Sequence, residues 1–96
     1  MLFIAFWHLG DIAPDKVAKL AADLMQKDKF PPEGVEVVSW LICPGGKGIT
    51  ILEAKDAKAA FKSWMSWVQA MPGFFKCYEL LPAIEAQEAI QMALKK

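Results

Sequence analysis

The chain carries no excess of charge of either sign, since its 11 basic side chains balance its 11 acidic ones. Proteins that capture nucleic acid or anionic lipid through electrostatic attraction usually present a net positive charge. We therefore expect neither nucleic acid nor a membrane surface among the partners of this protein.

Long apolar runs and metal-binding patterns are also missing. The apolar start, Met1 to Phe6, has no basic leader and is soon followed by Asp11, so it does not fit a signal peptide. No run approaches the length of a membrane span. The two cysteines, Cys43 and Cys77, form no CxxC pair, and we interpret them as small buried hydrophobic side chains. These absences predict a cytoplasmic protein with reduced thiols, no metal site and no assigned cofactor.

Apolar residues, by contrast, are abundant. They make up 55% of the 96 residues, which is high for a chain that can form only one domain, residues 1–96. A high apolar fraction without net charge predicts that another chain covers part of the surface.

Four apolar segments alternate with segments of helical periodicity. Strands are predicted at Leu2–Leu9, Val35–Cys43, Gly48–Ala54 and Phe74–Leu81. Helices are predicted to begin at Pro14, after the N-cap Asp56 and after Pro82. This order predicts an α+β, ferredoxin-like βαββαβ fold with a four-stranded antiparallel sheet, two helices on one face and an appended C-terminal helix.

Each of the first two helices has an apolar stripe that should face the sheet. In the first helix the spacing selects Val17, Leu20, Ala21 and Leu24. In the second helix it selects Ala57, Ala60, Phe61, Trp64 and Val68, and this stripe is widened by Met65, Trp67 and Met71.

The predicted strands are apolar on both faces, although two helices can cover only one. Strict alternation in the first strand separates Leu2, Ile4, Phe6 and His8 from Phe3, Ala5, Trp7 and Leu9. It groups Trp40 with Glu36, Val38 and Ile42, and it groups Tyr78 with Phe74, Lys76 and Leu80. Alternation does not decide which group meets the helices. In either case an apolar face is left over, and we expect a homodimer through this sheet face.

Several segments carry a family resemblance that spans nearly the whole chain. They are MLFIAFWHL, PPEGVEVVSWLICPGGKGITILEAKDAKAAFKSW with the following SW, and FFKCYELLPAIE. Together they resemble the domain of unknown function 3303 family within the dimeric α/β-barrel superfamily. The resemblance implies a ferredoxin-like dimer. It implies no activity, because the wider superfamily includes cofactor-free oxygenases, haem-handling enzymes and ligand-binding modules.

Three residues are candidates for a ligand-binding site: Trp7, His8 and Trp40. Trp7 and Trp40 could stack against a flat ligand at a cavity wall. His8, the lone histidine, titrates near neutral pH when unperturbed and is a weak catalytic candidate. In the resembled superfamily, the sheet face away from the helices lines the barrel cavity. The interpretation we favour is a strand-end histidine that is half exposed or hydrogen-bonded to the backbone.

Three functions remain open at this point, and whether the protein is an enzyme is undecided. The first is a small homodimeric module that binds a small apolar or aromatic molecule between sheet and helices, or serves only in interaction. The second is a cofactor-independent monooxygenase or isomerase that uses His8, and the third is a haem- or metal-handling protein with His8 as axial ligand.

Overall fold

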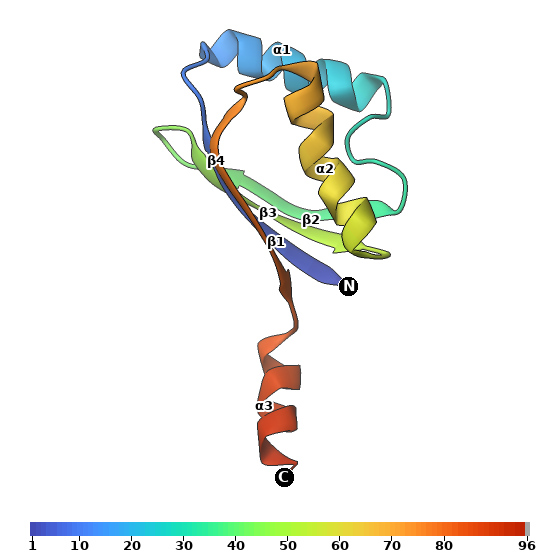
Figure 1. Ribbon diagram of the computed structural model, residues 1–96. Coiled ribbons are helices and arrows are strands. Elements are labelled where there is room, and N and C mark those ends of the chain that lie inside the picture. The colour runs from blue at the N-terminus through green and yellow to red at the C-terminus, as the bar shows by residue number, and fades with distance from the viewer. Residues whose placement is uncertain (96) are drawn as a thin grey trace.

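The computed structural model describes residues 1–95 and has the predicted order of elements. Its elements are β1 (Leu2–Leu9), α1 (Pro14–Gln26), β2 (Val35–Ile42), β3 (Lys47–Ala54), α2 (Ala57–Ala70), β4 (Phe75–Ala83) and α3 (Ala86–Leu94). The strands form one antiparallel sheet in the order β2-β3-β1-β4 (Figure 1). This arrangement confirms the predicted ferredoxin-like fold with an appended helix.

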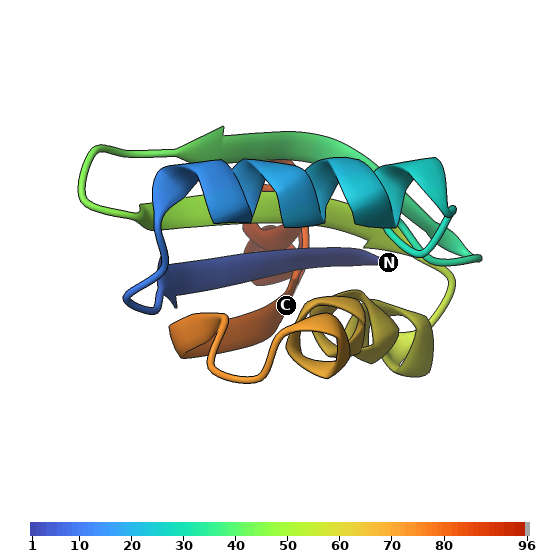
Figure 2. The same ribbon diagram turned by 90° about the horizontal axis from the view of Figure 1, so that it is seen from above.

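Helices α1 and α2 lie on the same face of the sheet, and we call the opposite face the outer face (Figure 2). One buried cluster joins Phe3 and Leu52 of the sheet to Ala59 and Ala60 of α2. These alanines let α2 approach the strands closely. A second cluster, Leu24, Phe30, Trp67 and Phe74, fills the space below α1. In α1, the predicted stripe is confirmed: Leu24 is buried, and its other members are half-buried.

The N-cap prediction for α2 is confirmed, but its predicted inward stripe is confirmed only at Ala60 and at Trp67, which was expected to widen it. The backbone N–H of Ala59 donates to Asp56 Oδ1 at 2.8 Å, and such caps stabilise a helix by about 1 kcal/mol. The residues that α2 buries are Ala59, Ala60, Ser63 and Trp67. Phe61 is 52% exposed. Close packing of the helix requires small side chains at the contact, so the wide aromatic side chains of Phe61 and Trp64 lie to one side.

Two β-bulges correct the predicted alternation of the edge strands. In β2, Val37 pairs with Leu52 and Ser39 pairs with Ile51, so Val38 is an extra residue. In β4, Phe75 pairs with Leu9 and Cys77 pairs with His8, so Lys76 is an extra residue. An extra residue shifts every later side chain to the other face. As a result, Val37 and Trp40 both face the helices, as do Phe75 and Tyr78.

Helix α3 extends away from the sheet as an arm (Figure 1). None of its residues is buried, and Ile90 and Leu94 are 52% and 74% exposed. The radius of gyration is 14.8 Å, whereas a compact chain of this length has about 12.5 Å. The arm therefore presents its apolar side chains to whatever lies next to the molecule. Within residues 1–95, no helix is both long enough and apolar enough to span a bilayer.

The interpretation of the two cysteines as buried side chains is wrong. Cys43 and Cys77 are both free and both exposed. Cys43 follows the edge strand β2, and Cys77 lies on the opposite edge strand β4. Edge positions have fewer neighbouring side chains to cover them, and the sheet width keeps these two thiols apart.

Candidate functional site

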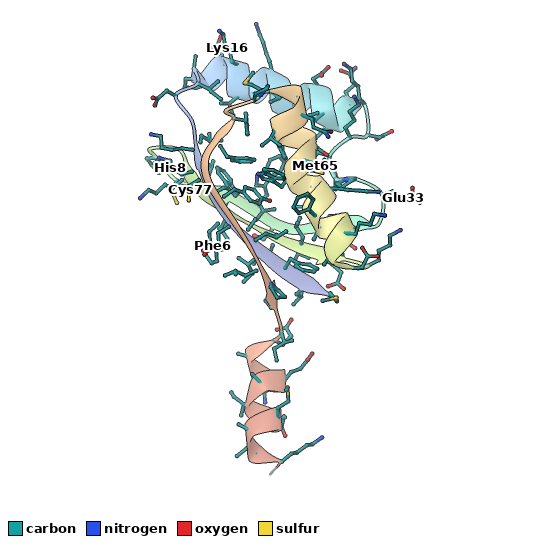
Figure 3. The ribbon with its side chains drawn as sticks, viewed as in Figure 1. Phe6, His8, Lys16, Glu33, Met65 and Cys77 are labelled. Carbon is teal, nitrogen blue, oxygen red and sulfur yellow. The ribbon has the colours of Figure 1, made fainter. Side chains whose placement is uncertain are left out.

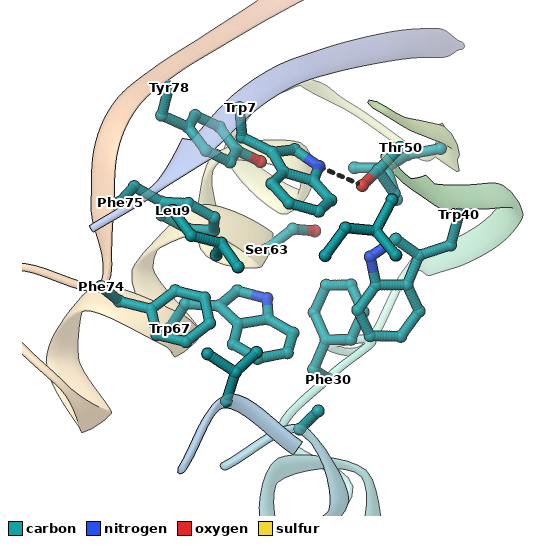
Figure 4. Close-up of a pocket in the computed structure, with 14 residues that line it drawn as sticks. Trp7, Leu9, Phe30, Trp40, Thr50, Ser63, Trp67, Phe74, Phe75 and Tyr78 are labelled. Atoms are coloured by element: carbon teal, nitrogen blue, oxygen red, sulfur yellow. Dashed lines mark hydrogen bonds between the residues drawn. The ribbon is translucent and has the colours of Figure 1, made fainter. Parts of the chain in front are cut away.

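A cavity of about 170 Å³ lies between the inner sheet face and the helices (Figure 4). All four strands contribute to its lining, through residues such as Trp7, Trp40, Thr50 and Tyr78. Helix α2 supplies Ser63 and Trp67, whereas α1 contributes only the small side chains of Val17 and Ala21. The cavity forms because α2 packs closely at its alanine end, while Leu24 is the single residue that α1 buries.

The walls are aromatic and centre on Trp67. Its ring is stacked with Phe74 at a centroid distance of 4.9 Å. It meets Phe30 edge-on at 5.0 Å and Trp40 edge-on at 5.8 Å. Aromatic pairs contribute about 0.5–1.5 kcal/mol each beyond the area they bury, so this wall resists collapse into the cavity. Trp40 is 39% exposed, which places its ring at the edge of the cavity.

The sheet side of the cavity is fixed by Trp7. Its Nε1–H donates to Thr50 Oγ1 at 2.9 Å, and this hydrogen bond is buried (Figure 4). The indole lies directly over Gly48, where a Cβ would come within 2.3 Å of ring atoms Cη2 and Cζ2. Glycine at this position therefore lets Trp7 lie flat against the sheet and leaves the cavity open.

The polar groups of the cavity are few and uncharged. Ser63 is 1% exposed, and within residues 1–95 its Oγ is the buried side-chain nitrogen or oxygen that has no hydrogen-bond partner. Burial raises the pKa of the Tyr78 hydroxyl from 10.0 to about 12, so this group is protonated at neutral pH. None of the lining residues is charged.

The predicted site residues do not all come together. Trp7 and Trp40 both line the cavity, but His8 points to the outer face, beside Lys47 on β3 and Cys77 on β4 (Figure 3). Adjacent strand residues point to opposite faces, so Trp7 and His8 are separated by the sheet. A site with all three residues is therefore not formed within one chain. Residues 1–95 also contain no group of three or more His, Cys, Asp or Glu side chains placed to hold a metal ion.

Sequence reasoning missed most of the cavity lining, above all Ser63 and Trp67. The usable signal was the spacing of small residues in α2. Ala59, Ser63 and Trp67 recur every fourth position, which places a serine and a tryptophan on the same face as the packing alanine. Phe30 carried no signal, because it lies outside every periodic segment and reaches the cavity from the loop after α1.

The comparisons with known proteins agree with this architecture. Protein Atu4242 from Agrobacterium tumefaciens has a TM-score of 0.53 and 15% identity, over 90% of this chain and 96% of that one. An antibiotic biosynthesis monooxygenase has a TM-score of 0.51 and 19% identity, over 88% of this chain and 100% of that one. At these identities the likeness shows the fold alone. No curated protein matches the chain. A family model matches residues 1–96, and the chain therefore belongs to the family described as Domain of unknown function (DUF3303).

Proposed function

We propose that this protein binds a small apolar or aromatic molecule in the cavity between the sheet and the helices. The observation that carries the proposal is a preformed aromatic cavity of about 170 Å³ with a few uncharged polar groups. Small-molecule sites are typically apolar and concave, with a small number of placed polar groups. An engineered apolar cavity of about 150 Å³ takes up benzene, so this volume suits a single aromatic ring with a small substituent.

The lining supports binding more than catalysis. Tyr78 is the only titratable side chain among the lining residues, and its pKa of about 12 is far from that of an effective acid or base at neutral pH. His8 lies on the outer face. The monooxygenase or isomerase alternative and the haem or metal alternative, which both rest on His8, therefore require a second copy that encloses this face.

We further propose that the protein is a homodimer through the outer face. Six residues there form a contiguous outer apolar patch: Ile4, Phe6, Leu41, Ile49, Ile51 and Leu81. The strand pairing makes them neighbours, and Phe6, Leu41 and Leu81 are 44%, 58% and 44% exposed. Single exposed apolar residues are common on protein surfaces, whereas a contiguous patch of this kind usually marks an interface.

The sheet face supplies more than half of the area that a stable dimer buries. Four strands of about eight residues present roughly 500 Å² per face, at about 4.8 Å between strands and about 3.3 Å per residue. Stable interfaces bury about 800 Å² per partner. Helix α3 and the connection before it can supply the remainder, since Ile90, Met92 and Leu94 of the helix and Ile84 of the connection are all more than half exposed.

The binding proposal is tested by filling the cavity. Ala21 of α1 lines the cavity, whereas the neighbouring Ala22 is exposed and does not. Ala21→Phe adds a ring inside the cavity, and Ala22→Phe adds the same ring at the surface. Titration with toluene, followed by tryptophan fluorescence and by the indole N–H signals in NMR, should saturate for wild type and Ala22→Phe. Ala21→Phe should lose binding by at least tenfold. Absence of saturable binding to wild-type protein would contradict the proposal.

A further inference from the structure

Ser63 is a buried polar residue whose hydroxyl makes no hydrogen bond within the described fold. The residue is 1% exposed, and its Oγ has no hydrogen-bond partner among residues 1–95. Ser66 on the same helix provides a contrast. The Ser66 hydroxyl reaches the carbonyl oxygens of Lys62 and Lys29 at 3.0 and 2.8 Å. Ser63 has no such bond to the preceding turn. Buried hydroxyl groups are normally paired, so this one points to a partner that binds in the cavity.

The position of Ser63 directs its hydroxyl to the cavity. It lines the cavity from α2, four residues before Trp67 and therefore on the same helix face (Figure 4). The opposite wall is the Trp7–Thr50 pair, in which Thr50 Oγ1 already accepts a hydrogen bond. A ring lying between these walls would bring its substituent within reach of Ser63 Oγ.

The hydrogen-bonding capacity of the lining favours a ligand that accepts. Indole N–H groups, such as those of Trp40 and Trp67, can only donate. No carboxylate, amide or imidazole side chain lines the cavity, so no side chain there is an acceptor only. The hydroxyls of Ser63 and Tyr78 each have a proton to donate. A ligand with a carbonyl oxygen matches this surplus of donors better than one that only donates.

The absence of charge in the lining excludes charged ligands. A carboxylate placed among these aromatic rings would lose its hydration without meeting any cation. We infer that the cavity takes an uncharged, single-ring aromatic compound with a carbonyl-type acceptor, which accepts a hydrogen bond from Ser63 Oγ. This inference rests on the ligand-binding function proposed above and adds to it the chemical class of the ligand.

The inference is tested with three probes of similar size: acetophenone, ethylbenzene and benzoate. Acetophenone brings a carbonyl acceptor, ethylbenzene has none, and benzoate is charged at neutral pH. Each is titrated into wild type, Ser63→Ala and the control Ser66→Ala. We expect Ser63→Ala to weaken acetophenone binding about tenfold, the effect of one lost neutral hydrogen bond, and to leave ethylbenzene binding unchanged. Ser66→Ala should change neither, and benzoate should bind none of the three proteins.

For each probe, the affinity for the variant is compared with the affinity for wild type. The difference in hydrophobicity between acetophenone and ethylbenzene therefore does not enter the comparison. If Ser63→Ala weakened the binding of acetophenone and ethylbenzene equally, the proposed hydrogen bond from Ser63 would be overturned, but the ligand-binding function would stand. If benzoate bound with an affinity similar to that of acetophenone, the inference that the cavity excludes charged ligands would be overturned. If neither neutral probe binds wild-type protein, the proposed function itself fails. Ser63→Cys has a weaker donor of similar size and should give an intermediate loss, so it provides a second reading if the alanine variant does not fold.

Discussion

Replacing Gly48 by alanine would place a methyl group where the indole of Trp7 already lies. The added Cβ would come within 2.3 Å of Trp7 Cη2 and Cζ2 and within 2.5 Å of the Leu41 carbonyl oxygen. The indole can move into the cavity, but the Leu41 carbonyl is part of strand β2 and cannot move without disturbing the sheet. Gly48→Ala is therefore an overpacking substitution with a rigid obstacle on one side.

The expected magnitude follows from two terms. Overpacking in a well-packed interior costs about 1–3 kcal/mol. Displacing Trp7 also breaks its 2.9 Å hydrogen bond to Thr50, which is worth about 1 kcal/mol. We expect a loss of about 3 kcal/mol in the free energy of unfolding. For a domain of this size, that corresponds to a fall of roughly 12 to 24 °C in melting temperature.

Urea unfolding followed by circular dichroism measures the loss directly, and the toluene titration measures its effect on the site. Since the displaced indole occupies the cavity, toluene affinity should fall together with stability. Gly48→Ala should cost less stability in a Trp7→Leu background than in wild type, because the indole clash is then absent and only the Leu41 clash remains. A Gly48→Ala protein within about 0.5 kcal/mol of wild type, with unchanged toluene binding, would refute the packing of Trp7 on Gly48.

Two further predictions concern the outer face and the buried phenol. Leu41→Asp or Ile49→Asp should convert a dimer to a monomer in sedimentation at micromolar concentration, whereas the exposed Lys58→Asp should not; a wild-type monomer would contradict the dimer. The pKa of Tyr78 is raised from 10.0 to about 12, so the folded state holds this proton more tightly than the unfolded state does. The contribution of the protonated Tyr78 hydroxyl to the free energy of unfolding is complete below pH 10. As the pH rises towards 12, the free energy of unfolding should fall by on the order of 2 kcal/mol. Tyr78 is the only tyrosine, so ultraviolet titration reports its pKa alone, and Tyr78→Phe should remove that part of the pH dependence of unfolding.

The sequence was sufficient for the order of elements and for several of their ends. Pro14 and Asp56 marked the starts of α1 and α2 correctly, because both act through local backbone geometry. The strand positions followed from apolar runs separated by proline and glycine. These signals depend on residues a few positions apart, which is the range over which a single sequence is informative.

The cavity could not be predicted in the same way, because it depends on long-range geometry. Trp40 and Tyr78 line it only because bulges at Val38 and Lys76 shift the later side chains of two strands. Neither bulge has a glycine that would have marked it. The rotation of α2 was missed for a related reason: the alanines that allow close packing have a weaker hydrophobic signal than Phe61 and Trp64, although they occupy the contact.

The bulge at Val38 makes the cavity depend on the number of residues in β2 as well as on their identity. Deleting Val38 alone removes no side chain from the cavity and breaks none of its hydrogen bonds. Without Val38, residues 37, 39 and 40 would alternate regularly against Leu52, Ile51 and Thr50, so Trp40 would still face the cavity. If β2 instead kept its length and paired regularly after Val37, Trp40 and Ile42 would turn outward and join the outer apolar patch. In relatives of this chain, the spacing between the residues that correspond to Val37 and Trp40 is accordingly a guide to an intact cavity, because an odd spacing requires a bulge and an even spacing does not.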